Sequence, residues 1–361
     1  MINIRAAIIS LGSKSSQWTY TAMQKYFDEV DSLDLRKIEV NLEKDRFEVL
    51  YASKPLREYD CIYAKGSFRY EAILRALTSA MHKKCYMPLT PQAFTAGHNK
   101  LLTHLECMES NIPMPRTYLA SSTEAAKNML DSLPYPLVIK FPHGTQGKGV
   151  MFADSHSTAV SILDALSVLK QPILLQEYIE TEGTDIRAIV VGDKVAASMY
   201  RKAEKGDVRA NIHAGGKGIP CMLDSKAKKI ALDTAQAIGA EICAVDILES
   251  PRGPLMIEIN LSPGLQGITD ATNIDVADKI ARHLFNRTME IEHAGEKMDS
   301  DRMLEEFSLE KTHLIQNMIV NAEMRGERLL LPKLITKLSD INLNDEISIS
   351  AKKGSVEIKK M

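Results

Sequence analysis

Residues 241–264 read EICAVDILESPRGPLMIEINLSPG. Two apolar, β-rich runs flank a Pro-Arg-Gly turn, a pattern that is typical of a β-hairpin. If the turn centres on the Pro-Arg pair, facing positions have numbers that sum to about 503, so Asp246 lies nearly opposite Glu258. Asn260 follows Glu258 by two positions, so both side chains leave the same face of the sheet. The hairpin therefore brings two carboxylates and an amide oxygen together.

These three side chains predict a metal site. Carboxylates that converge in an apolar ladder are unfavourable unless a cation neutralises them. Carboxylate and amide groups supply hard oxygens, which favours Mg²⁺ over zinc or copper. The alternative is a solvated hairpin face with incidental acids, but Val or Ile brackets both Asp246 and Glu258. We therefore expect Asp246, Glu258 and Asn260 to bind Mg²⁺.

A second stretch, PLVIKFPHGTQGKGVMFADS at residues 136–155, places Lys140 in an apolar strand directly before a glycine-rich loop. The loop fits neither the G-x-G-x-x-G dinucleotide fingerprint nor a P-loop, in which Ser or Thr follows Gly-Lys. A lysine in an apolar strand needs an anion, and small loop residues let backbone N–H groups approach that anion. Since Mg²⁺ held by few carboxylates usually shares a phosphorylated substrate, this stretch is predicted to bind phosphate. Lys100 is a further candidate, as are Arg209 and Asn211 beside a glycine pair.

The composition excludes several classes of protein. The chain has 361 residues, of which 45% are hydrophobic and 25% charged, and a formal net charge of -2 that gives no overall attraction to nucleic acid or anionic membrane. No run approaches the ~20 apolar residues that span a bilayer, and the N-terminal apolar run is too short for a signal peptide. The five cysteines form no C-x-x-C pair, which argues against a zinc ribbon or a disulfide framework. We expect a cytoplasmic protein without membrane contact.

Strand–helix alternation at the start of the chain predicts an α/β domain with parallel pairing. A second unit is expected from residue 95, and a charged, turn-rich, aromatic-poor stretch after residue 286 is expected to be a linker. Five segments result: an α/β domain (1–94), two further units (95–180 and 181–287), a linker with a helix (288–325) and a small β-rich appendage (326–361).

Residues from about 60 to 285 resemble the RimK-like group of ATP-grasp ligases, the alpha-L-glutamate ligase type. The stretches that carry the resemblance are NKLLTHLECMESNIPMPRT, LVIKFPHGTQGKGV, QEYIETEGTDIRAIVVGDKV, GDVRANIHAGG, VDILESPRGPLMIEINLSPGLQGI and TNIDVADKI. The resemblance implies an α/β (α+β) ATP-grasp fold. In that fold 1–94 is the N-terminal pre-ATP-grasp domain, 95–180 the central lid subdomain and 181–287 the C-terminal subdomain with the metal site.

The resemblance also implies roles for individual residues. Those implied to hold ATP phosphates are Lys100, Lys140 and the lid residues Gly144, Thr145, Gln146, Gly147 and Gly149. The others implied to hold ATP are Glu177, Tyr178 and Ile179 beside the adenine, Asp185 at the ribose, and Arg209 and Asn211 at the reacting phosphates. Asp246, Glu258 and Asn260 would hold two Mg²⁺ ions, for which Mn²⁺ can substitute, and Lys140 and Arg209 would neutralise charge during phosphoryl transfer. Arg187 and Arg201 are suited to anchoring a substrate carboxylate, although either is alternatively a surface hairpin charge.

The implied reaction is ATP-dependent formation of an amide or peptide bond through an acyl-phosphate. An amino acid such as L-glutamate would be added to a carboxylate acceptor, which is a protein, a carrier protein or a coenzyme. One position departs from the family: Ala214 stands where many relatives have arginine, which puts the substrate contacts on that side in doubt. The alternatives are an ATP-grasp ligase for a different amine and carboxylate, and an ATP-binding regulator that acts through a DNA-binding tail.

The tail, ERLLLPKLITKLSDINLNDEISISAKKGSVEIKK, resembles the AbrB/MazE-like swapped-hairpin module. Such modules dimerise by interleaving strands, and several bind DNA. We expect the tail to make the protein a homo-oligomer, either a dimer or a tetramer, in preference to binding DNA.

Overall fold

The computed structural model describes residues 3–44, 46–142, 149–202 and 217–309, and nearer the C-terminus residues 323–325, 328–330, 341, 345–353 and 355–360. The chain divides into two units, 1–291 and 292–361. Among the described residues, no helix combines the length and apolar character that crossing a membrane requires.

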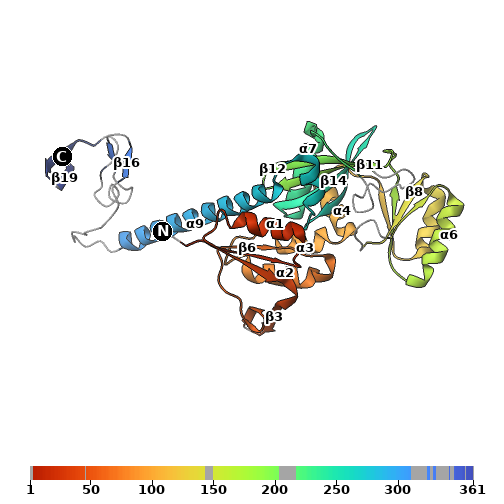
Figure 1. The fold of residues 1–361 in the computed structure, drawn as a ribbon, viewed down its shortest axis with the longest axis horizontal. Helices are drawn as coiled ribbons and strands as arrows, with labels where there is room; N and C mark the ends of the chain where they lie inside the picture. Colours follow the sequence, from red (N-terminus) through yellow and green to blue (C-terminus); the bar gives the residue numbers. More distant parts are fainter. Residues whose placement is uncertain are drawn as a thin grey trace. The chain divides into compact units, whose positions relative to one another are not determined.

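A three-stranded parallel sheet of order β2-β1-β6 begins the first unit (Figure 1). Its strands are β1 (Arg5–Ser10), β2 (Glu29–Asp34) and β6 (Cys61–Ala64). The helices that follow these strands are α1 (Lys14–Met23), α2 (Glu71–Met81) and α3 (Pro91–Gly97). The parallel pairing confirms the expected α/β domain, and it places the carboxyl ends of β1 and β6 at one edge of the sheet.

The sequence did not lead us to expect the antiparallel sheet inserted between β2 and β6. Its strands are β3 (Ile38–Glu43), β4 (Arg46–Tyr51) and β5 (Lys54–Pro55). Short 3-10 turns occur at Leu35–Lys37, Phe68–Tyr70, Leu130–Ser132 and Ser167–Leu169.

A smaller lobe is built on a four-stranded sheet of order β7-β10-β8-β9, seen with α6 at the right of Figure 1. Its elements are β7 (Thr117–Ala120), α5 (Thr123–Met129), β8 (Leu137–Lys140), β9 (Val150–Ala153), α6 (His156–Leu166) and β10 (Ile173–Glu177). The lobe has its own hydrophobic core, drawn from residues between Ala120 and Leu175. Helix α4 (Lys100–Glu109) lies in the expected 95–180 segment but contributes Cys107 to the other core.

The C-terminal sheet of the first unit is antiparallel, with the order β13-β12-β11-β14-β15. Its strands are β11 (Thr184–Val191), β12 (Lys194–Lys202), β13 (Lys217–Pro220), β14 (Ile242–Ser250) and β15 (Gly253–Asn260). Helices α7 (Ser225–Ile238) and α8 (Gln266–Thr272) accompany it. The predicted hairpin is present as β14 and β15, and this sheet shares one hydrophobic core with the N-terminal parallel sheet. The two sheets therefore form a single platform beside the smaller lobe.

Helix α9 (Val276–Leu309) contradicts the expected turn-rich linker after residue 286. Its first turns are anchored because Ile280 and Leu284 are fully buried in the shared core. The residues beyond them include several Glu, Met and Arg, which are good helix formers, and no proline interrupts them. In the second unit, two antiparallel hairpins confirm a β-rich tail: β16 (Glu323–Arg325) with β17 (Arg328–Leu330), and β18 (Ile347–Lys352) with β19 (Ser355–Lys360).

Candidate active site

A cavity of about 680 Å³ opens within the first unit. Its wall contains residues from the carboxyl ends of β1 and β6, from α4, from β8 and β10 of the smaller lobe, and from β11, β14 and β15 of the C-terminal sheet. Of the site residues predicted from the sequence, those that line it are Lys100, Lys140, Glu177, Tyr178, Ile179, Asp185, Arg187, Arg201, Asp246, Glu258 and Asn260. The fold thus brings together predicted site residues that are up to 160 positions apart in the sequence, from Lys100 to Asn260.

The hairpin register is close to the predicted one. From Ser250–Gly253 to Ile247–Met256 the paired numbers sum to 503, and a β-bulge then makes Asp246 directly opposite Glu258. Met256 and Ile259 both belong to the core although they are three apart, which strict alternation would not allow. The bulge therefore turns Glu258 toward the cavity.

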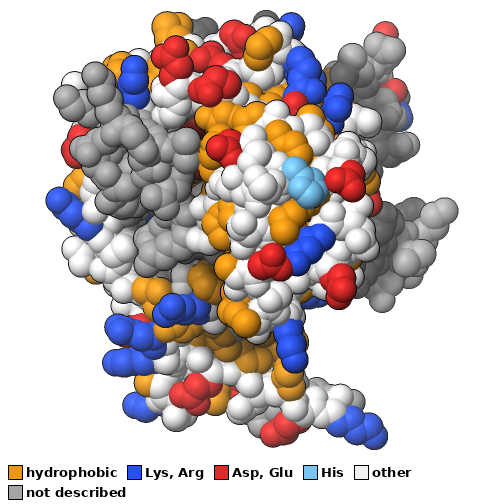
Figure 2. Space-filling view, turned by 90° about the vertical axis from the view of Figure 1, so that its right-hand side faces the viewer, with side chains coloured by type: hydrophobic (Ala, Val, Ile, Leu, Met, Phe, Trp, Pro, Cys, Tyr) orange, Lys and Arg blue, Asp and Glu red, His pale blue; other side chains and the backbone are white. Residues whose placement is uncertain are grey.

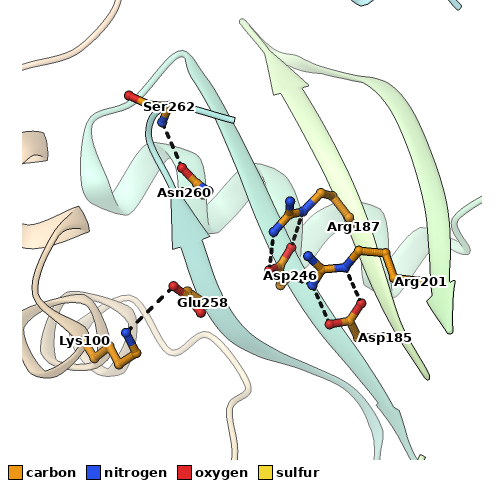
Figure 3. A network of polar contacts seen from close by, with 8 residues as sticks. All are labelled: Lys100, Asp185, Arg187, Arg201, Asp246, Glu258, Asn260 and Ser262. Carbon is orange, nitrogen blue, oxygen red and sulfur yellow. Dashed lines mark hydrogen bonds and ion pairs between the residues drawn. The ribbon is translucent and has the colours of Figure 1, made fainter. Parts of the chain in front are cut away.

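The three predicted metal ligands share one side of this sheet (Figure 3). The Glu258 carboxylate is 42% exposed and lies 3.9 Å from the ammonium of Lys100. The amide oxygen of Asn260 accepts a hydrogen bond from the backbone N–H of Ser262 at 3.0 Å, which fixes its orientation. Oδ1 of Asp246 and Oδ1 of Asn260 each accept one hydrogen bond from the described residues and keep a second lone pair, so this donor set fits Mg²⁺.

A buried network of two arginines and two aspartates lies beside these ligands (Figure 3). Arg187 makes a bidentate contact with Asp246, at 2.8 Å for both hydrogen bonds. Arg201 donates to both oxygens of Asp185, at 2.7 and 2.5 Å, and its guanidinium also lies 2.8 Å from Asp246. Arg201 is only 6% exposed, so the alternative that it is a surface charge is wrong. Its anchoring of a substrate carboxylate stays a prediction, as does the ribose contact of Asp185.

The charges in this network set the ionisation of its aspartates. Burial alone would raise the pKa of Asp246, but the guanidiniums of Arg187 and Arg201 outweigh it and hold the pKa well below its usual range. Burial raises the pKa of Asp185, although Arg201 opposes the shift. Asp246 is consequently a carboxylate at neutral pH, as a metal ligand must be.

Lys140 is held by a chain of hydrogen bonds. Its ammonium donates to the side-chain oxygen of Gln176 at 2.6 Å, so the amide nitrogen of Gln176 must face the other way, toward Thr117 and His104. His104 accepts there through Nε2, so its Nδ1 carries the proton and donates to the carbonyl of Lys100 at 2.6 Å. Burial lowers the pKa of Lys140 to about 8. These hydrogen bonds connect both predicted phosphate lysines, and no sequence motif had pointed to Gln176 or His104 in this role.

The predicted adenine hinge follows β10. The Glu177 side chain points to Arg252 of the hairpin turn, with Oε1 2.7 Å from its guanidinium, and Oε2 accepts from the backbone of Arg116. The Tyr178 ring meets Phe152 edge-on at 4.9 Å, and Ile179 is buried. These side chains contact other residues of the protein, which leaves the backbone groups of the hinge to recognise adenine. That recognition stays a prediction.

Several predicted site residues lie outside the described residues: Gly144, Thr145, Gln146, Gly147, Arg209, Asn211 and Ala214. Gly149 is described and has a φ of +77°, and a Cβ there would lie 3.1 Å from the Phe141 ring. A side chain at Gly149 would therefore strain the backbone at the end of the loop.

Figure 2 shows Lys and Arg side chains and Asp and Glu side chains scattered among apolar and uncharged groups over the described part of one face. This distribution agrees with the nearly balanced formal charge of the chain.

Known proteins resemble the chain in sequence and in fold. Residues 97–284 match the family described as the RimK-like ATP-grasp domain. A probable alpha-L-glutamate ligase of Legionella pneumophila (strain Corby) is 45% identical over 182 residues, or 50% of this chain and 60% of that protein. Another, from Xanthomonas oryzae pv. oryzae (strain MAFF 311018), is 33% identical over 289 residues, or 78% of this chain and 97% of the relative. The chain thus spans less than two thirds of the Legionella protein's length.

Solved structures share the fold at low sequence identity. The RimK domain ATP-grasp protein of Sphaerobacter thermophilus superposes with a TM-score of 0.61 at 17% identity, over 78% of this chain and 99% of that chain. The ATP-grasp ligase PsnB, complexed with precursor peptide PsnA2 and AMPPNP, gives 0.62 at 15% identity, over 80% and 99%. These findings confirm the ATP-grasp fold and the resemblance seen in the sequence. The chain belongs to the RimK-like ATP-grasp family.

Proposed function

We propose that the protein is an ATP-dependent ligase that joins an amino acid to a carboxylate acceptor through a carbon–nitrogen bond. The observation that carries this proposal is that Lys100 and Lys140 line the same cavity as the oxygen ligands of the β14–β15 hairpin. Such an arrangement suits a magnesium-bound triphosphate. Glutamate is the favoured amino acid because the relatives are named probable alpha-L-glutamate ligases.

The proposed mechanism follows because the oxygen of a carboxylate is a poor leaving group, so an amine cannot displace it directly. Transfer of the γ-phosphoryl group of ATP to the acceptor carboxylate would give an acyl-phosphate, and the amine would then expel phosphate. Lys140 and Lys100 would hold the phosphates, and Asp246, Glu258 and Asn260 would hold Mg²⁺, with Mn²⁺ as a substitute. Bound Mg²⁺ would neutralise the negative charge of the phosphates. Two Mg²⁺ ions and a closing role for the loop around Gly144 to Gly149 are part of the proposal.

Phosphate release in the presence of ATP, Mg²⁺ and panels of amino acids and carboxylates tests this function. We expect release that requires both an amine and a carboxylate, with glutamate as the preferred amino acid. A ligase for a different pair would respond to another combination in the same panel. Nucleotide binding without turnover for any pair would instead favour a regulator that acts through its tail.

ATP affinity of the ligand-free protein should fall as the pH rises above about 8, the pKa to which burial lowers Lys140. A phosphate favours the ammonium form, so above that pKa binding requires proton uptake, and Kd should rise by up to about tenfold per pH unit. Calorimetric titration at several pH values would measure this slope. Lys140→Arg keeps its charge throughout and should show a flatter profile, so an unchanged slope in that variant would assign the pH dependence elsewhere.

The C-terminal tail is proposed to make the protein a homo-oligomer in preference to binding DNA. In the β18–β19 hairpin, Ile349 and Val356 are 60% and 56% exposed, and the register places both on one face. A second copy of the hairpin would cover this face. Light scattering should give a smaller oligomer for a chain that ends after Ile291, a cut that leaves the buried Thr288 in place. An unchanged number of subunits would exclude the tail as the oligomerisation element.

A further inference from the structure

The N-terminal domain contributes a wall of the cavity that the proposed ATP and metal sites do not use. The wall follows two neighbouring parallel strands at the edge where their carboxyl ends meet. Its residues include Ser13, Ser15 and Ser16 after β1, and Lys65 and Gly66 after β6. Ligands of open α/β sheets bind outside the carboxyl ends of strands, so this wall is placed to receive part of a substrate.

Lys65 is the only cation on this wall and is 4% exposed. Among the residues that the structure describes, its ammonium has no hydrogen bond and no ion pair, and its one charge contact is with the Tyr63 ring at 5.6 Å. Burial alone lowers its pKa to about 8. Lys140, by contrast, is half-buried and donates to Gln176 at 2.6 Å. A buried cation without a partner is unfavourable, so Lys65 is placed to bind an anion.

The first turn of α1 adds backbone donors to the same wall. Ser13 caps the helix by accepting from the N–H of Ser16 at 3.2 Å. The N–H groups of Lys14 and Ser15 have no acceptor within the described part of the chain, as is usual for the first turn of a helix. The helix N-terminus carries partial positive charge, so it favours the same anionic ligand as Lys65.

Hydrogen bonds tie this wall to the predicted metal hairpin. The Ser262 hydroxyl accepts from the N–H of Gly66 and donates to its carbonyl, both at 2.9 Å. The backbone of Ser262 in turn donates to Asn260. A Cβ at position 66 would lie 2.7 Å from the Leu35 side chain, so a larger residue there would force Leu35 to shift. The residue after Lys65 is thus fixed beside a predicted metal ligand.

We infer that Lys65, together with the first turn of α1, binds the carboxylate of the acceptor and holds it at the N-terminal side of the cavity. The inference rests on the proposed ligase function, because only that function requires a carboxylate opposite the nucleotide. It makes Lys65 an acceptor-binding residue that takes no part in binding ATP.

Binding of carboxylates to the full-length protein tests this assignment. The probes are acetate, glutarate and N-acetyl-L-glutamate, whose blocked amine excludes it as the amine substrate, each titrated in the presence of Mg²⁺ and ADP. For Lys65→Met, we expect Kd for the best probe to rise about 10- to 100-fold, as loss of a charge-assisted hydrogen bond predicts. Kd for ADP should stay unchanged. Lys84→Met, at an exposed lysine, controls for the lost charge and should bind like the natural protein.

The melting temperature separates this role from a structural one. If Lys65 serves a ligand, Lys65→Met should leave the melting temperature of the ligand-free protein unchanged or raise it, and Lys65→Gln provides a second neutral variant. Equal carboxylate affinity in the variants and the natural protein would overturn the assignment, as would the absence of carboxylate binding to the natural protein. Neither result contradicts the ligase proposal. That proposal is tested by phosphate release, and it would be wrong if the natural protein showed no release that depends on an amine and a carboxylate.

Discussion

Glu258→Ala should abolish ATP turnover and leave the fold intact. The Glu258 side chain is 42% exposed in the cavity, and among the described residues its ion pair is with Lys100 at 3.9 Å. Truncation therefore removes no core packing, whereas it removes a carboxylate that the proposed magnesium site requires. We expect a loss of roughly 10³-fold or more in turnover, since removal of one preorganised charge-stabilising group already costs 10²- to 10³-fold. Steady-state phosphate release and the melting temperature measure the two parts of this prediction.

Glu249 offers a matched control on the same hairpin. It lies on β14, is exposed, and pairs with Pro254 near the turn, so Glu249→Ala makes the same chemical change outside the predicted metal set. That variant should keep turnover near the natural level. Glu258→Gln keeps the shape of the side chain and removes its charge, and it should resemble Glu258→Ala. Full turnover of either Glu258 variant at ordinary Mg²⁺ concentration would remove Glu258 from the metal site.

The hairpin that carries Glu258 could be predicted because its determinants are local. The turn residues fix the centre of the hairpin, and the two-residue period of a strand fixes which side chains share a face. The predicted strand register differed from the observed one by one residue beyond Met256. The β-bulge there could not be predicted, because the hydrophobic pattern was read as strict alternation. Lys140 was predicted by the same local logic, because a lysine inside an apolar strand needs an anion.

The partners of these residues could not be predicted because they depend on the order of strands. Arg187 meets Asp246 only because β11 lies between β12 and β14, a pairing between segments about 60 residues apart in the sequence. Lys65 shows the same local signal as Lys140, at the end of an apolar strand, and was missed because no motif drew attention to it. The linker after residue 286 was misjudged because charged composition was read as irregular structure, whereas those residues also favour a helix.

Asp246→Ala should destabilise the protein as well as inactivate it. Asp246 accepts both guanidinium hydrogen bonds of Arg187 and lies 2.8 Å from Arg201, and all three side chains are largely buried. Because the pKa of Asp246 lies below its usual range, this stabilisation is fully present at neutral pH. Removing one partner of a buried ion pair costs about 3–5 kcal/mol, so we expect the melting temperature to fall by roughly 10 °C. Thermal unfolding measured beside turnover would show both losses.

The same substitution in an exposed ion pair distinguishes the effect of losing a buried carboxylate from the effect of losing a carboxylate charge alone. Asp233 pairs with Lys229 on the surface of α7, where the lysine side chain is 74% exposed, so Asp233→Ala should leave the melting temperature unchanged. Combining Asp246→Leu with Arg187→Met removes both charges of the bidentate Arg187–Asp246 pair and should recover much of the lost stability while turnover stays absent. Recovery of turnover in that double variant would show that Asp246 acts only by neutralising Arg187. A stable but inactive double variant would instead separate its structural contact with the arginine from its proposed role as a metal ligand.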